Sequence, residues 1–147
     1  MKIFLAGIMQ GSHVTACVHD QSYRDSLHGI VQGHWPKAEV YDPFANHTES
    51  VGYSSGRARD VFRQHIRMCQ QFDVLIAFVP EASMGTAIEM WEAHTNARFV
   101  ITITPLIHNW VVQITSNVVY GTVSAFVESL RSGEIDKLIG HEQISPD

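Results

Sequence analysis

Residues 73–93, DVLIAFVPEASMGTAIEMWEA, constrain the fold more than any other part of this chain. The run of large apolar residues at 74–79 is typical of a central strand in a parallel sheet that is covered on both faces. Pro80 ends the strand because its nitrogen has no hydrogen to donate. Ser83 then stands where a helix can begin. The stretch therefore predicts a buried strand, a tight turn and a helix.

The rest of the chain repeats this alternation of strands and helices. We predict strands over residues 2–6, 38–41, 74–79, 98–104 and 117–120, and helices over residues 13–33, 57–72, 84–97 and 122–132. Residues 111–116 fit either a helix or a strand, and residues 42–56 form a polar loop that is long for a connection. The pattern predicts a single-domain α/β fold with a doubly wound, mostly parallel five-stranded sheet in flavodoxin-like order. We assign the domain to residues 1–135 and predict a weakly ordered tail over residues 136–147.

Composition narrows the range of partners. The formal net charge is −5, whereas binding a nucleic-acid polymer needs clustered Lys and Arg, so such a polymer is excluded. Only 17% of the residues are charged, compared with about a quarter in typical soluble domains. This shortage predicts that a partner subunit covers part of the surface, as in a homodimer or a higher homo-oligomer.

The chain shows no sign of a metal site, a disulfide framework or a membrane span. Its nine histidines are scattered without HxH or HExxH spacing. Cys17 and Cys69 are the only cysteines and are far apart, which fits a reducing cytoplasm. The opening MKIFLAGIM is followed at once by polar residues, so we interpret it as a first strand and not as a signal peptide. No segment approaches the ~20 apolar residues that cross a bilayer.

Glu89 is the main candidate for chemistry. It lies among apolar neighbours on the helix after the buried strand, with Gly85 and Ala93 one turn away on either side. Open α/β sheets bind ligands near the carboxyl ends of their strands, which is where this helix starts. The residues alone leave open whether Glu89 faces a ligand or is an ordinary surface glutamate.

Two short segments carry the candidate binding residues. The first turn of the helix at 84–97 can hold an anion or a sugar hydroxyl with free N–H groups and hydroxyls, or its serine can simply cap the helix. The loop after the first strand has glycines that permit close approach and a serine that can cap the helix predicted at 13–33. The candidate residues are Gly7, Gly11, Ser12, Ser83, Gly85 and Thr86.

The pattern S-x-G-T-x-x-E, from Ser83 to Glu89, resembles the signature of the nucleoside 2-deoxyribosyltransferase family, and the strand at 2–6 with Gly7 is similar to the family's opening strand. The family includes transferases that exchange nucleobases and hydrolases that cleave nucleoside 5′-monophosphates at the N-glycosidic bond. The resemblance spans residues 3 to about 130. It implies that Glu89 is the nucleophile, that Ser83 contacts a 5′-phosphate in the phosphohydrolase branch, and that a small-molecule nucleoside or nucleotide is the partner, with no cofactor.

The chain departs from this family at two positions. Members of the resembled family usually carry an aspartate where this chain has His65, and His65 is a candidate acid or base because its unperturbed pKa lies near neutrality. Phosphate-specific relatives often carry an arginine in the first loop, where this chain has Gln10 and His13, which favours unphosphorylated substrates. Two alternatives stay open, namely a non-catalytic nucleotide-binding or sensing module on the same fold and an NAD-cleaving hydrolase.

Overall fold

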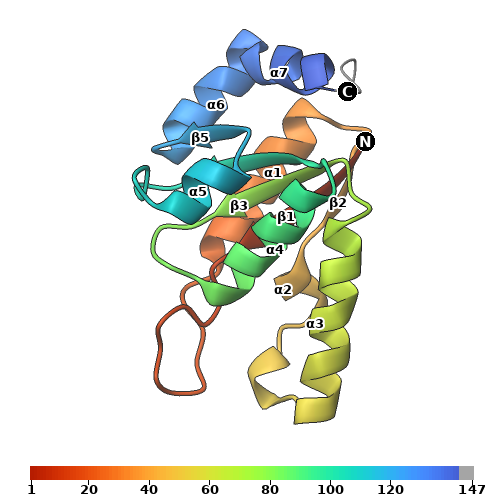
Figure 1. Cartoon of the computed structure of the whole chain (residues 1–147), viewed down its shortest axis with the longest axis vertical. Coiled ribbons are helices and arrows are strands. Elements are labelled where there is room, and N and C mark those ends of the chain that lie inside the picture. The colour runs from red at the N-terminus through yellow and green to blue at the C-terminus, as the bar shows by residue number, and fades with distance from the viewer. Residues whose placement is uncertain (143–147) are drawn as a thin grey trace.

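A computed structural model describes residues 1–142 of the chain, and Figure 1 shows their arrangement. Five strands form one parallel sheet in the order β2-β1-β3-β4-β5. The strands are β1 Lys2–Gly7, β2 Glu39–Tyr41, β3 Val74–Phe78, β4 Phe99–Ile103 and β5 Val118–Tyr120. The α/β class, the doubly wound five-stranded sheet and the flavodoxin-like strand order are confirmed.

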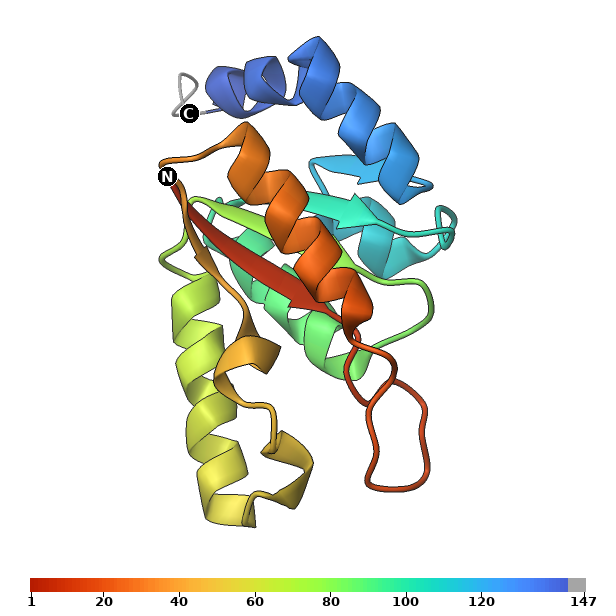
Figure 2. The same ribbon diagram turned by 180° about the vertical axis from the view of Figure 1, so that it is seen from behind.

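Helices cover both faces of the sheet (Figures 1 and 2). They are α1 Ser22–His34, α2 Pro43–Asn46, α3 Ser55–Cys69, α4 Met84–Thr95, α5 Trp110–Thr115, α6 Val123–Ser132 and α7 Glu134–Glu142, with a 3-10 turn η1 at Ser50–Gly52. Alternate residues of β1 separate two cores, because successive strand side chains point to opposite faces. Ile3 and Leu5 pack with α1, α6 and α7, whereas Phe4 and Ala6 pack with α3 and α4.

The first helix begins later than predicted. Helix α1 starts at Ser22, so Ser12 caps no helix and Cys17 lies in a loop, and the helix predicted from residue 13 is wrong in its first part. Residues 8–21 have no apolar stripe to bury, and Val14 in their middle is fully exposed. Just before α1, Asp20 accepts hydrogen bonds from both the backbone N–H and the hydroxyl of Ser22, which is the first residue of the helix.

The structure shows the secondary structure of three segments that the sequence left as a loop, an ambiguous stretch or a tail. The loop at 42–56 contains α2, which Asp42 caps by accepting the Phe44 N–H, and the turn η1. The ambiguous residues 111–116 are mostly helical, because Asn109 accepts N–H groups at the start of α5. Helix α7 crosses the assigned boundary at residue 135 and includes residues 136–142, while residues 143–147 lie outside the described part of the chain.

The C-terminal helix α7 is fastened to α1 by polar contacts as well as by its apolar face. Asp136 lies 2.9 Å from Nε2 of His34 and accepts a hydrogen bond of 2.8 Å from the Trp35 indole N–H. Ile135 and Ile139 pack into the core on the α1 side of the sheet. Within residues 1–142, no helix is long and apolar enough to cross a membrane.

Candidate active site

A cavity of about 400 Å³ lies beside the carboxyl ends of β1 and β3, between α3, α4 and the loop after β1; we call it the site cavity. This is the edge at which parallel sheets bind their ligands. Seven of the eight residues predicted from sequence line it, namely Gly7, Gly11, His65, Ser83, Gly85, Thr86 and Glu89. The eighth, Ser12, lies outside it and lines a neighbouring cavity instead.

Glu89 is buried on α4, with only 9% of its surface exposed. Burial raises the pKa of its carboxyl group to about 8, because a charged carboxylate is poorly solvated there, and the positive charge of Arg24 partly opposes this rise. No described residue donates a hydrogen bond to this carboxyl group. Glu89 is therefore an unpaired carboxyl group that lines the site cavity, an arrangement common for catalytic acids and bases.

Arg24 on α1 is a buried cation whose charge acts on Glu89, and the sequence analysis did not find it. Its exposed fraction is 2%. The guanidinium donates to the backbone oxygens of Leu5 and Gly7 at 3.1 and 2.9 Å and to Asp42 at 2.8 Å, and Nε donates to Gln21. These contacts fix the carboxyl ends of β1 and β2 against α1. The one signal in the sequence is helical spacing, since position 24 lies on the same face of α1 as the buried Leu27 and Val31.

His65 lies on α3 with 8% of its surface exposed. Its Nε2 is 3.2 Å from the Tyr41 hydroxyl oxygen, and its ring makes edge contacts with Phe4 and Tyr41. Burial lowers the pKa of His65 to about 4, and the positive charges of His47 and Arg24 add to this effect. The expectation of a group that titrates near neutrality is therefore wrong, and His65 is a neutral imidazole at neutral pH.

The first turn of α4 forms the wall of the site cavity beside Glu89. Ser83 occupies the N-cap position but accepts no backbone N–H, so the prediction of a side-chain cap is wrong. Its hydroxyl instead lies 3.0 Å from that of Thr86. A side chain added at Gly85 would meet nothing, so the space beside the Gly85 backbone is open. The turn thus offers two hydroxyl groups and the positive end of a helix to a bound molecule.

The loop after β1 forms another wall. A Cβ atom at Gly7 would clash with the hydroxyl of Tyr23, which donates a hydrogen bond to the Ile8 carbonyl. Gly11 has a φ of +53°, a conformation that glycine adopts without strain. Both glycines are therefore required by the fold of the loop, whether or not a ligand approaches them.

The remaining wall is aromatic, and the sequence analysis did not assign its main members to the site. Tyr53 and Phe62 line the site cavity from η1 and α3. The Tyr53 hydroxyl lies 3.0 Å from His47 Nδ1 and accepts a hydrogen bond from Arg57, whose guanidinium lies 3.8 Å from the Tyr53 ring centre. Aromatic walls of this kind suit a flat ring stacked against them.

No protein-family model matches the sequence, and no characterised protein sequence is significantly similar to it. Solved structures do share the fold. A 2-deoxyribosyltransferase from Bacillus psychrosaccharolyticus aligns with a TM-score of 0.70 and 14% identity over 94% of this chain and 96% of its own. A conserved protein from Enterococcus faecalis V583 aligns with a TM-score of 0.63 and 15% identity over 90% of this chain and 98% of its own.

A third solved structure, a CMP N-glycosidase from Clostridium botulinum, aligns with a TM-score of 0.53 and 21% identity over 90% of this chain and 99% of its own. The chain thus has a flavodoxin-like α/β fold with a cavity at the carboxyl edge of its sheet. More particularly, it shares that fold with a 2-deoxyribosyltransferase and a CMP N-glycosidase, which agrees with the family that its motifs resemble.

Proposed function

We propose that this protein belongs to the nucleoside 2-deoxyribosyltransferase family and cleaves or transfers the N-glycosidic bond of a nucleoside or nucleoside 5′-monophosphate. One observation carries the proposal: Glu89, the last residue of the S-x-G-T-x-x-E motif, is a buried, unpaired carboxyl group in the site cavity. The similarity of fold to a deoxyribosyltransferase and an N-glycosidase supports it.

In the proposed reaction the Glu89 carboxylate attacks C1′ of the sugar. A bond forms between the carboxylate oxygen and C1′, and the C1′–N bond breaks with its electron pair leaving on the base, which then takes up a proton. Water or a second base next attacks C1′ and releases the carboxylate. Because burial raises the pKa of Glu89 to about 8, the group must lose a proton before it can attack.

His65 takes a restricted part in this scheme. A neutral imidazole can accept a proton or a hydrogen bond, but it carries no extra proton to give to a departing base. We therefore assign His65 a base or sugar-positioning role in place of the family aspartate, with its orientation set by the Tyr41 hydroxyl.

The charges around the site cavity favour an unphosphorylated nucleoside. None of the residues that line it within the described chain is Lys or Arg. Arg24 is occupied by four hydrogen bonds, and Arg57 lies against Tyr53. Ser83 and the N-terminus of α4 remain the candidate contacts for a phosphate, but they supply only partial positive charge to a dianion.

We propose that the protein acts as a homodimer or a higher homo-oligomer. The adjacent helices α4 and α5 carry large apolar side chains on their exposed surfaces. Grouped exposed apolar side chains of this kind are typical of a surface that binds another protein. These residues are Met84, Ile88, Trp91, Trp110, Val111 and Ile114.

We further place the protein in the cytoplasm, because Cys17 and Cys69 are free thiols.

The His65 substitution favours a second candidate function, a nucleotide-binding or sensing module without turnover. A neutral, buried imidazole replaces the charged carboxylate of the family, so a ligand could bind beside Glu89 without reacting. This candidate predicts binding of nucleosides with no release of free base.

The test incubates the protein with a panel of nucleosides, nucleoside monophosphates and NAD and measures the release of free base by chromatography. The wild type should release base, and Glu89→Gln should lose on the order of 10³-fold or more of the rate because it removes the nucleophile and keeps the shape. Glu92→Gln is the matched control: Glu92 lies on the same helix outside the site cavity and binds Gln70. Equal rates in wild type and Glu89→Gln would refute the assignment.

A second free base added to the same reaction distinguishes transfer from hydrolysis. A transferase should form a new nucleoside at the expense of free sugar, because the acceptor base competes with water for the glycosyl-enzyme. A hydrolase should release free sugar at the same rate with or without the acceptor.

A further inference from the structure

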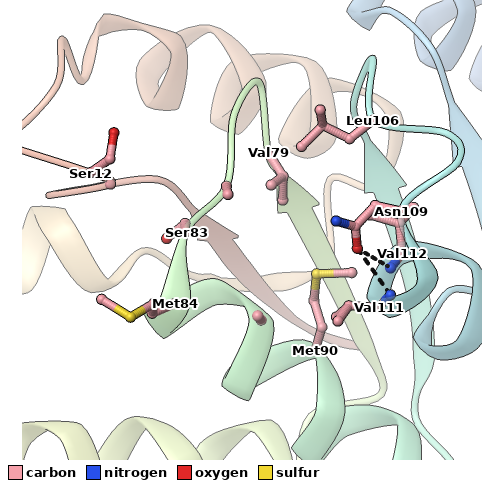
Figure 3. A pocket seen from close by; sticks show the side chains of 12 residues that line it. Ser12, Val79, Ser83, Met84, Met90, Leu106, Asn109, Val111 and Val112 are labelled. Atoms are coloured by element: carbon pink, nitrogen blue, oxygen red, sulfur yellow. Dashed lines mark hydrogen bonds between the residues drawn. The ribbon is translucent and has the colours of Figure 1, made fainter.

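The backbone of Ser83 has the conformation of a helix N-cap, but its side chain does not cap the helix. Its φ and ψ are −136° and 115°, and its carbonyl accepts the first intrahelical hydrogen bond, from the Ala87 N–H at 3.0 Å. A serine in this position ordinarily also accepts the N–H of the third helical residue, which is Thr86 here, through its side chain. No side-chain cap forms on α4. Figure 3 shows Ser83 where the chain enters this helix, beside the neighbouring cavity that Ser12 lines.

Three other helices of this chain, α3, α5 and α6, have the cap that α4 lacks. In each of them a side-chain oxygen accepts the N–H of the third helical residue, and that residue has no hydroxyl group of its own. Figure 3 shows the cap on α5 as dashed lines from the Asn109 oxygen. The pairs of cap and third residue are Ser54 with Arg57, Asn109 with Val112, and Thr122 with Ala125.

Thr86 differs from these third residues because it carries a hydroxyl group. Its side chain is buried, with 2% of its surface exposed, and its Oγ1 lies 3.0 Å from Oγ of Ser83. A buried hydroxyl group needs a hydrogen-bond partner, and among the described residues Ser83 provides it. The hydroxyl of Ser83 is thus engaged by the side chain of Thr86 and not by its backbone N–H.

The uncapped turn opens into the site cavity. Ser83, Gly85 and Thr86 line this cavity together with Glu89, which lies one turn further along α4. The first N–H groups of a helix have no intrahelical acceptor, and a side chain at Gly85 would meet nothing, so a bound molecule can reach them. Glu89 independently indicates a ligand in the same place, because its carboxyl group is only 9% exposed and receives no hydrogen bond from the described residues.

We propose that Thr86 is a positioning residue of this site. Its hydroxyl holds the hydroxyl of Ser83 and so keeps the N–H groups at the start of α4 free for an oxygen atom of the ligand. The helix forgoes the stability that a serine cap would give it. That the oxygen belongs to a nucleoside or nucleotide rests on the proposed function, whereas the uncapping itself does not.

Amide hydrogen exchange, followed by NMR, tests the uncapping without turnover. Thr86→Val keeps the branched shape and removes the hydroxyl, so Ser83 is free to cap α4. After correction for the intrinsic effect of the side chain, exchange of the amide at position 86 should slow by about fivefold or more. Adding Ser83→Ala to Thr86→Val should reverse the slowing, and Thr86→Ser should exchange as the wild type does.

The amides of Arg57 and Ala125 are internal controls, because they are capped in the wild type and lie on other helices. Their exchange should be the same in all variants, which shows that the fold is intact. Equal exchange at position 86 in the wild type and Thr86→Val would overturn the proposal.

A titration with inorganic phosphate tests the consequence for the site, since phosphate is a simple oxygen ligand for helix N–H groups. It is done near pH 6.5, where the Glu89 carboxyl group is mostly protonated because its pKa is about 8. Phosphate should shift the amide signals of Gly85 and Thr86 in the wild type. Thr86→Val should weaken the affinity by about fivefold or more, because the new cap competes for an N–H group, and Thr86→Ser should not.

Absence of phosphate-dependent shifts at Gly85 and Thr86, or equal affinities in the wild type and Thr86→Val, would overturn the proposal even if base release at Glu89 is found. Absence of base release, with the expected exchange and phosphate results, would instead refute only the proposed reaction.

Discussion

The hydroxyl oxygen of Tyr41 and Nε2 of His65 are 3.2 Å apart, and this contact joins the end of β2 to the C-terminal half of α3. His65 is buried and Tyr41 is partly buried, and burial is the main cause that lowers the pKa of His65 and raises that of Tyr41. The pair is therefore a hydrogen bond between two neutral groups at neutral pH. It holds an imidazole at the wall of the site cavity.

This geometry predicts the behaviour of His65 variants. His65→Asp should keep or raise the rate of base release, because it restores the family carboxylate, and His65→Ala should lower the rate with little effect on nucleoside affinity. Rates are measured with the His65 variants themselves. Affinities are measured by titrating nucleoside into proteins that carry the His65 substitution together with Glu89→Gln. If His65→Ala changes neither quantity, the residue only packs against Phe4 and Tyr41.

The pH dependence of the rate should report Glu89 and not His65. Attack requires the ionised carboxylate, so kcat/KM should increase about tenfold per pH unit below a pKa of about 8 and level off above it. The pH profile of kcat/KM should show no change of slope near pH 6.5 from His65, because the pKa of His65 is about 4. A profile of kcat/KM between pH 5 and 9.5 tests both statements, and a plateau that begins near pH 5 would contradict the raised pKa of Glu89.

Stability should also depend on pH through Glu89. Its pKa is raised in the folded protein from 4.5 to about 8, so the unfolded chain ionises first as pH increases. Folding stability is then lost from pH 4.5 upward until the folded group ionises too, by a few kcal/mol at most. Glu89→Gln removes this loss, so its advantage over wild type in urea unfolding should grow from pH 5 to pH 9. His65 acts in the opposite sense, because its lowered pKa costs stability as pH falls from 6.5 toward 4.

Arg24 should be one of the most sensitive positions for stability. Arg24→Met removes the donor that Arg24 supplies to the Asp42 carboxylate and to the Leu5 and Gly7 carbonyls, and breaking such a buried pair costs about 3–5 kcal/mol. Chemical denaturation measures the loss. Arg59→Met on the exposed surface of α3 is the matched control and should change stability by less than about 0.5 kcal/mol. Equal losses in both variants would mean that Arg24 is not a structural anchor.

Phosphate selectivity offers a gain-of-function test. Gln10 lines the site cavity, at a loop where phosphate-specific relatives carry arginine, whereas the nearby His13 lines neither cavity. Gln10→Arg should increase the affinity of Glu89→Gln protein for a nucleoside monophosphate relative to the nucleoside, because Arg binds phosphate through two parallel hydrogen bonds. His13→Arg adds the same charge outside the cavity and should not. A wild-type preference for the monophosphate would contradict the assignment of unphosphorylated substrates.

The sequence predicted those features that depend on local pattern. Apolar runs located the strands, and the strand-turn-helix at 73–93 placed Glu89 at the correct edge of the sheet. The start of α1 was missed because residues 8–21 lack both an apolar stripe and an early stop signal. Arg24, Tyr53 and Phe62 were not assigned to the site, since their positions depend on how separate elements approach one another in space.

Because Arg24 is buried, dissolved ions cannot surround it. Arg24 and Glu89 are both buried, so the Debye screening that weakens surface pairs affects their attraction much less. Added salt should weaken an exposed pair such as Lys2 and Glu39, which are 3.6 Å apart, and leave the ionisation of Glu89 nearly unchanged. The acidity of the proposed nucleophile is thus set mainly by its burial and by Arg24, and it depends little on ionic strength.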